Sequence, residues 1–127
     1  MRFAYDTRQR PVLPMKLSGP AGSTRVSALV DSGADVNVLP WSIGVNLGLD
    51  WNANKATIRV AGVPQGAAAM PVLIEAEIED LGSVTLAFAW CQSDAVPLVL
   101  GQTNFFMEFD ICFFRSRGEF QVVRKAS

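Results

Sequence analysis

The feature that most constrains the fold is a period-two alternation of apolar and charged residues over positions 72–79. In an extended chain, successive side chains point to opposite faces, so this pattern predicts a strand with one buried and one solvated face. A polar turn at 80–83 then leads into residues 84–90, where every second residue is again apolar. The two segments together predict an antiparallel hairpin, on which the acidic stripe of Glu75, Glu77 and Glu79 forms a solvated face.

Other short segments with strand character follow one another at close intervals. They are residues 12–17, 24–30, 57–61, 96–100, 111–114 and 120–123. Pro14 favours an edge position for the first of these. Only two short helices are predicted, at 40–49 and at 104–109, the second with Thr103 as its N-cap. This order predicts an all-β, barrel-like domain that spans residues 1–127.

Composition narrows the class of protein. Half of the 127 residues are apolar and 18% are charged, which is typical of a globular chain. The net charge of −1 argues against a nucleic-acid partner, and no apolar stretch reaches the length of a membrane span. Residues 1–6 do not resemble a signal peptide. We therefore expect a cytoplasmic protein without a membrane span.

The chain contains no histidine and two cysteines, Cys91 and Cys112. The absence of histidine removes the Ser-His-Asp triad, the Cys-His dyad and most zinc sites, so neither a metal nor a cofactor is expected. Both cysteines lie among apolar residues and are predicted to be buried thiols. Any acid–base chemistry of this chain must therefore come mainly from carboxylates.

One carboxylate stands out. Asp31 follows the apolar run 28–30 and precedes a turn of small residues, after which a second apolar stretch covers positions 36–39. A carboxylate at the end of a buried strand is costly unless its charge is hydrogen-bonded or shared. The hydroxyl of Ser32 and the backbone N–H groups around Gly33 could provide such hydrogen bonds. A simple Asx-type turn is the alternative interpretation of this segment.

Asp31-Ser32-Gly33-Ala34, preceded by Ala28-Leu29-Val30, resembles the active-site signature of retropepsin-like aspartic proteases of the retroviral type (clan AA). Val99-Leu100-Gly101 matches the family's apolar-apolar-glycine element, and residues 62–70 lie where the family has its β-hairpin flap. The resemblance covers residues 12–112 and favours the bacterial or cellular single-lobe branch. It implies a closed β-barrel with a flap, and an aspartic endopeptidase acting on peptide or protein substrates.

The same resemblance implies a role for each matching residue. Asp31 would be the catalytic aspartate, Ser32 would brace the two halves of the site across a dimer, and the backbone of Gly33 would approach the substrate. The implied substrate-binding residues are Ala34, Asp35 and Val38 beside the signature, and Ala61, Gly62, Val63 and Gly66 in the flap.

An aspartic protease needs two carboxylates that share a proton, and this chain has one such signature. Asp35 lies too close in sequence to be the second member of a symmetric pair, and Asp110 is expected to orient a turn. We therefore expect a homodimer in which each copy contributes its own Asp31. Two alternatives stay open: a catalytically silent domain of the same fold, used for dimerisation or peptide binding, and an unrelated β-barrel binding module.

The remaining aromatic residues and the basic residues have structural interpretations. Packing roles are expected for Trp41, Trp51 and Trp90, and a core position for the cluster at 105–109. The basic residues of the C-terminal hairpin are interpreted as protection of an edge strand.

Overall fold

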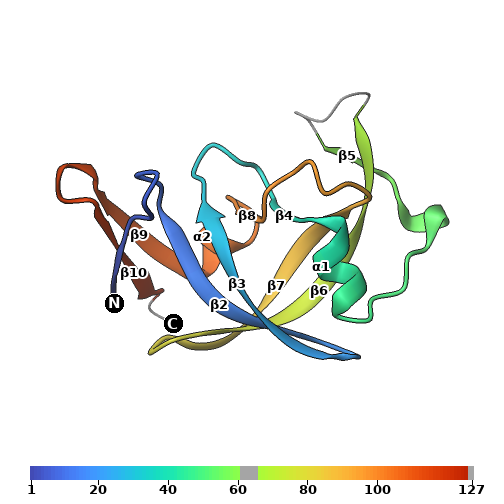
Figure 1. Cartoon of the computed structure of the whole chain (residues 1–127), viewed down its shortest axis with the longest axis horizontal. Helices are drawn as coiled ribbons and strands as arrows, with labels where there is room; N and C mark the ends of the chain where they lie inside the picture. The colour runs from blue at the N-terminus through green and yellow to red at the C-terminus, as the bar shows by residue number, and fades with distance from the viewer. Residues whose placement is uncertain (61–65, 126–127) are drawn as a thin grey trace.

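The computed structural model describes residues 1–60 and 66–125, and these residues form two β-sheets with short helices between their strands (Figure 1). In chain order the strands are β1 (Arg2–Ala4), β2 (Val12–Gly19), β3 (Gly22–Val30), β4 (Asn37–Leu39), β5 (Ile58–Val60), β6 (Ala67–Ile78), β7 (Gly82–Cys91), β8 (Val99–Leu100), β9 (Phe109–Phe114) and β10 (Glu119–Arg124). The helices are α1 (Trp41–Asn46), α2 (Phe105–Glu108), and the 3-10 turns η1 (Ala53–Lys55) and η2 (Arg115–Arg117).

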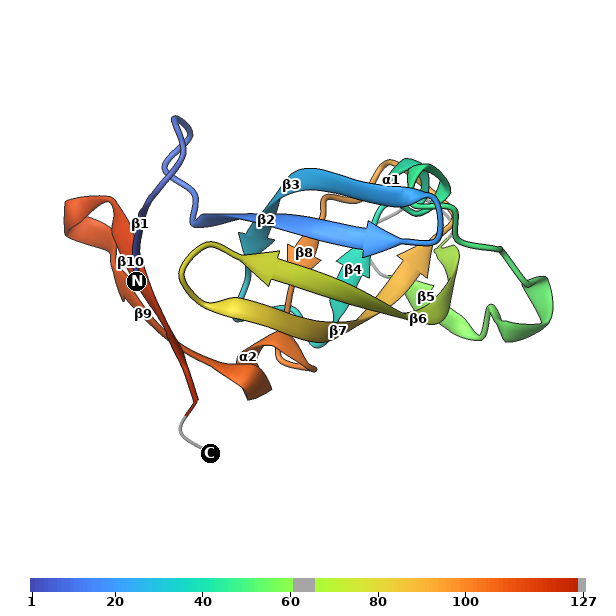
Figure 2. The same cartoon turned by 90° about the horizontal axis from the view of Figure 1, so that it is seen from below.

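The larger sheet closes into a barrel. Its strand order is β2-β3-β8-β4-β7-β6-β5, and a further pairing between β2 and β6 joins the ring, with β5 outside it on β6. Figure 2 shows β2 lying between β3 and β6. In a closed ring every strand has a hydrogen-bonded neighbour on each side, so no strand edge of the ring is left unpaired. The predicted all-β barrel is confirmed.

The smaller sheet, in the order β1-β10-β9, brings the two ends of the chain together (Figure 1). Phe120 and Val122 of β10 are fully buried against the barrel, and Phe3 stacks on Phe120 at 5.5 Å between ring centroids. The C-terminal hairpin predicted from sequence is therefore confirmed, and β1 is its third strand.

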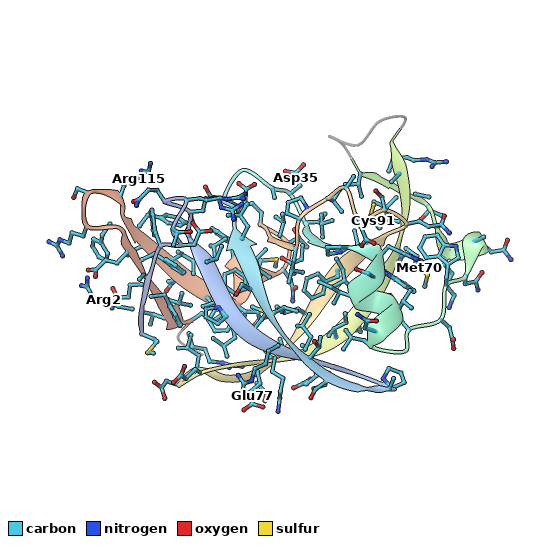
Figure 3. All side chains as sticks on the ribbon, in the orientation of Figure 1. Arg2, Asp35, Met70, Glu77, Cys91 and Arg115 are labelled. Atoms are coloured by element: carbon cyan, nitrogen blue, oxygen red, sulfur yellow. The ribbon has the colours of Figure 1, made fainter. Side chains whose placement is uncertain are left out.

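The hairpin of β6 and β7 follows the predicted alternation. Ile74 pairs with Leu86 and Ala76 with Val84, and all four side chains are buried. The acidic stripe faces solvent, where Glu77 lies 3.3 Å from the ammonium group of Lys16. Figure 3 places Glu77 and Asp35 on opposite sides of the barrel, so the stripe lies away from the Asp31 loop.

Helix α1 packs on Trp90 through a buried glycine. The ring of Trp90 stacks on Trp41 at 4.8 Å between centroids, contacts the edge of Trp51 and donates its Nε1–H to the carbonyl of Trp41. A Cβ atom at Gly44 would lie 2.1 Å from Nε1 of Trp90, so only glycine allows this approach. The packing role predicted for the three tryptophans is confirmed.

Two predictions about strands are corrected by the structure. Strand β2 is not an edge strand, because its residues 16–18 pair with β6, and Pro14 is tolerated because it lies outside that pairing. The strand predicted at 96–100 is reduced to β8, since Val99 and Leu100 alone pair with neighbouring strands.

The segment around α2 also differs from prediction. The N-cap is Asn104 rather than Thr103, and the helix is a single turn. Met107 is 60% exposed, so the aromatic cluster is core only in part. Asp110 lies within β9, paired with Val123, and does not orient a turn.

The two cysteines have different environments. Cys91 is fully buried, and desolvation raises the pKa of its thiol. Cys112 is exposed, contrary to prediction, because it pairs with Gln121 on the face of the small sheet that points away from the barrel. Among the described residues, no helix is long and apolar enough to cross a membrane.

Candidate active site

Asp31 lies where two central strands of the barrel end together. Strands β3 and β8 run parallel, with Val30 opposite Leu100, and the backbone N–H of Asp31 donates to the carbonyl of Leu100 at 3.0 Å. The side chain of Asp31 is half-buried. The barrel therefore holds this carboxylate at the rim of its core, where one side of the group remains open to solvent.

The turn after Asp31 hydrogen-bonds to the carboxylate. The N–H of Gly33 donates to Oδ1 of Asp31 at 2.9 Å, and the N–H of Ala34 donates to the Asp31 carbonyl at 3.1 Å. Backbone N–H groups around Gly33 thus supply the expected partner. The Ser32 hydroxyl is exposed and makes no hydrogen bond to Asp31 within the chain. The turn fixes the orientation of the carboxyl group and leaves its second oxygen available.

The residues that follow β8 hydrogen-bond to the loop after Asp31. Gln102 donates its side-chain Nε2–H to the carbonyl of Ser32 at 2.8 Å and its backbone N–H to the carbonyl of Ala34, also at 2.8 Å. One residue further, the N–H of Thr103 donates to the carbonyl of Asp35 at 2.9 Å. Three carbonyl groups of the loop, those of Ser32, Ala34 and Asp35, are therefore tied to one short segment.

Gly101 makes this contact possible. A Cβ atom at Gly101 would lie 2.7 Å from the carbonyl oxygen of Ala34 and 2.6 Å from that of Val36. Any other residue would push the two segments apart. This is a physical reason for glycine after Val99 and Leu100.

A buried amide pair secures the far end of the loop. Asn37 is fully buried; its Oδ1 accepts from the N–H of Gly101 at 2.8 Å, and its Nδ2 donates to Oδ1 of Asn104 at 3.0 Å. The same Asn37 amide also donates to the carbonyl of Ala87, whose N–H in turn donates to Asn104. The amide pair therefore links the loop to strand β7.

Sequence reasoning missed both asparagines. The available signal was a single amide, Asn37, interrupting the apolar stretch at 36–39. A buried polar side chain must find partners, so such an interruption predicts a hydrogen-bonded role. Gln102, which was not among the predicted site residues, contacts the loop directly.

A cavity of about 310 Å³ opens beside the turn. One wall is the loop after Asp31, and the other is strand β5. The lining residues are Gly33, Ala34, Asp35, Val36, Val38, Ile58, Arg59 and Val60. Asp35 and Arg59 are exposed and bring opposite charges to its walls, whereas Val38 belongs to the buried apolar cluster beneath it.

The structure thus brings most of the predicted site residues near the turn together. Gly33, Ala34, Asp35 and Val38 line this cavity, and Asp31 lies two residues before the first of them. Gly66 has a left-handed φ of 61° and immediately precedes β6. The other predicted flap residues, Ala61, Gly62 and Val63, lie outside the described residues.

Nowhere in residues 1–60 and 66–125 do three or more acidic, cysteine or histidine side chains group around a possible ion position. One half-buried carboxylate next to a cavity can accept or donate a proton, and it can hold a water molecule by a hydrogen bond. It cannot by itself supply a second carboxylate on the opposite side of a bound substrate.

Comparison with solved structures identifies the architecture. A retropepsin-like aspartic protease from Rickettsia conorii superposes with a TM-score of 0.70 over 96% of this chain and 88% of that protein, at 14% sequence identity. The chain has a retropepsin-like fold. The EIAV protease, solved with the inhibitor HBY-793, is also similar, with a TM-score of 0.58 and 17% identity over 79% of this chain and 88% of that one.

The likeness lies in structure rather than in overall sequence. No protein-family model matches this chain, and no curated protein sequence matches it. Its fold is therefore that of the retropepsin-like barrel and not of another type of β-barrel.

Proposed function

We propose that this protein is an aspartic-type endopeptidase whose active site forms when two copies bring their Asp31 side chains together. The observation that carries the proposal is the placement of Asp31. It lies half-buried at the ends of β3 and β8 of a retropepsin-like barrel, oriented by the Gly33 N–H and next to a cavity.

The chemistry requires a pair of carboxylates. Two such groups a few ångströms apart cannot both ionise, so they share one proton. The ionised member takes a proton from a water molecule, whose oxygen attacks the carbonyl carbon of the peptide. The protonated member donates a hydrogen bond to the carbonyl oxygen. Return of a proton to the amide nitrogen then releases the amine, and the dyad regains its starting state.

A second copy is required because the chain offers one suitable carboxylate. Asp35, the nearest alternative in sequence, lines the cavity wall four residues further on and is exposed. A two-fold axis beside Asp31 would place the same group from the partner opposite it, because such an interface repeats each residue. The proposal therefore includes a homodimer as the active species.

We propose that the cavity is the cleft for an extended peptide. In the described part of the chain, β5 pairs with β6 alone, so its other edge is free to pair with a substrate backbone. The loop from Gly33 to Val36 forms the opposite wall. Ala61, Gly62, Val63 and Gly66, which lie between β5 and β6 in sequence, are proposed as a flap over the bound peptide.

Cleavage of an unbiased peptide library tests the proposal. Wild-type protein should cleave peptides, and Asp31→Asn should lower the rate by about a thousandfold or more, since the amide cannot take up the proton from water. Asp110→Asn, which alters an exposed carboxylate on β9, is the matched control and should retain wild-type activity.

Thermal unfolding of each variant would show whether it is folded. A folded wild-type protein without cleavage between pH 3 and 8, roughly the span of carboxylate-dyad titration, would overturn the proposal in favour of a silent peptide-binding or dimerisation domain. Cleavage that survives Asp31→Asn would overturn the assignment of Asp31.

A further inference from the structure

Five of the eleven basic residues of the chain lie at one end of the molecule, and all five are arginines. Arg115 and Arg117 belong to the turn η2 between β9 and β10, and the loop at 6–10 lies against this turn, because Arg115 donates to the carbonyl of Gln9 at 2.6 Å. Figure 3 shows Arg2 and Arg115 at the same end. We call these exposed residues the arginine cluster: Arg2, Arg8, Arg10, Arg115 and Arg117.

The arginine cluster has an excess of positive charge. Two carboxylates contact it: Asp6 accepts two hydrogen bonds from Arg10, at 2.9 and 3.0 Å, and Glu119 lies 2.7 Å from Arg2. The other three arginines have no carboxylate partner within residues 1–60 and 66–125. Five arginines against two carboxylates give a local net charge of +3, so the rest of a chain whose total is −1 carries −4.

Aromatic rings support three of the guanidinium groups. Arg2 and Arg117 lie over the ring of Phe114, at 4.5 and 5.3 Å from its centroid, and Arg115 lies over Tyr5 at 5.7 Å. A guanidinium group that rests on an aromatic face loses less side-chain freedom when it binds an anion. Its planar fork of donors also matches the two oxygens of a carboxylate. The cluster is therefore arranged to bind anionic groups.

Protection of an edge strand does not explain these arginines. Arg115 and Arg117 follow Phe114, which forms the last pair of the β9–β10 ladder with Glu119, and so they lie beyond the paired strands. The arginines of the loop at 6–10 lie outside any strand as well. The concentration of charge therefore needs another explanation.

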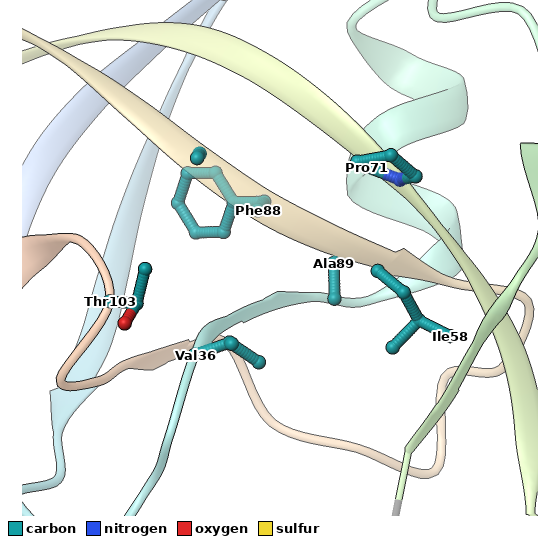
Figure 4. A pocket seen from close by; sticks show the side chains of 7 residues that line it. Val36, Ile58, Pro71, Phe88, Ala89 and Thr103 are labelled. Carbon is teal, nitrogen blue, oxygen red and sulfur yellow. The ribbon is translucent and has the colours of Figure 1, made fainter.

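The cleft beside Asp31 offers no comparable surface. The pocket in Figure 4 adjoins the cavity and is lined by Val36, Ile58 and other uncharged residues. Among the described residues that line the cavity itself, Arg59 is the one cation, and Asp35 brings the opposite charge. An acidic ligand would therefore find most of its counter-charges at the arginine cluster.

The pattern of charge distinguishes between anionic partners. A nucleic acid carries a phosphate on every unit, so Asp6, Glu119 and the negative remainder of the chain would repel it. In an acidic polypeptide, neutral residues separate the carboxylates, and their N–H groups can donate to Asp6 and Glu119. We propose that the arginine cluster is a docking surface for an acidic polypeptide segment of another protein. This inference does not depend on the proposed protease activity.

Fluorescence anisotropy with a labelled peptide of alternating glutamate and glycine tests the proposal. Wild-type protein should bind this peptide at about 0.1 M salt and lose affinity at about 0.5 M, because the charges are exposed and salt screens them. A peptide with glutamine in place of glutamate should bind about tenfold more weakly or less, since it lacks the charge.

A pair of matched double variants locates the surface. Arg8→Glu combined with Arg117→Glu should weaken binding of the glutamate peptide by about tenfold or more. Arg25→Glu combined with Lys55→Glu reverses the same number of charges at exposed positions on β3 and η1, and should change the affinity by less than about twofold, because charges beyond about 10 Å are screened. Thermal unfolding would confirm that both variants are folded.

Backbone amide NMR of wild-type protein provides a readout that needs no variant. The glutamate peptide should shift the signals of Gln9 and Gly118, which lie within the cluster, and leave those of Gly33 and Ala34 unchanged.

Three results would overturn the proposal. Equal losses of affinity in the two double variants would show an effect of net charge alone. Shifts confined to Gly33 and Ala34 would place the peptide in the cleft. Tighter binding of a short oligothymidylate, or of phosphatidylserine vesicles, than of the glutamate peptide would indicate a nucleic-acid or membrane surface instead.

Discussion

At the scale of single residues, the geometry around Asp31 depends on a few amide side chains. Gln102 holds the carbonyl of Ser32, and Asn37 with Asn104 ties the end of the loop to β7. Asn37 has the largest structural role of these, because it is fully buried and both ends of its amide group are hydrogen-bonded. Its removal would leave the N–H of Gly101 without its acceptor in the interior.

We predict that Asn37→Ala lowers the free energy of unfolding by about 2–4 kcal/mol, because buried polar groups lose their partners and a small cavity forms. Urea denaturation measures this change. Asn54→Ala, at an exposed position of η1, is the control and should change stability by less than about 0.5 kcal/mol. A similar small change for Asn37→Ala would show that the amide network does not hold the loop.

At the scale of elements, the packing of α1 on β7 depends on the close contact between Gly44 and Trp90. Glycine disfavours a helix, yet this helix has one at its centre because the tryptophan ring occupies the place of a side chain. The requirement of tertiary packing here outweighs local helix propensity.

We predict that Gly44→Ala destabilises the protein by about 1–3 kcal/mol or more, although the same change in an exposed helix would stabilise it by up to about 1 kcal/mol. Denaturation followed by tryptophan fluorescence would measure the effect, since Trp90 lies at the contact. Val45→Ala, on the exposed side of the same helix, should have little effect. Stabilisation by Gly44→Ala would contradict the packing.

At the scale of the whole molecule, one chain has the architecture of a retropepsin-like lobe and half of the proposed dyad. The proposed active unit is therefore a pair of chains, and its population must depend on protein concentration.

We predict that the cleavage rate rises with the square of the chain concentration below the dissociation constant of the dimer. An excess of Asp31→Asn chains should inhibit wild-type protein by forming mixed dimers with one aspartate, whereas an excess of Asp110→Asn chains should not. Kinetic dilution series combined with sedimentation equilibrium would measure both effects. A rate that stays proportional to concentration in a species that sediments as a monomer would contradict the shared site.

The accuracy of sequence-based prediction differed with the range of the contacts involved. The β6–β7 hairpin was predicted correctly because its alternation and its turn are local. The prediction that β2 is an edge strand was wrong because closure of the barrel depends on its pairing with residues 75–77, which are far away in the sequence. The prediction that Cys112 is buried was wrong because apolar neighbours in the sequence do not reveal which face of a strand is covered.

The sequence by itself determined the strand pattern, the class of fold, and the single Asp31 turn with the residues that follow it to Val38. These features depend on residues adjacent in the chain, whose period and spacing are visible without a structure. Only the tertiary structure decided how the barrel closes, that Asn37 pairs with Asn104, and that the loop after Asp31 faces strand β5 across a cavity. Those contacts join residues that are distant in sequence, and packing of the whole chain alone brings them together.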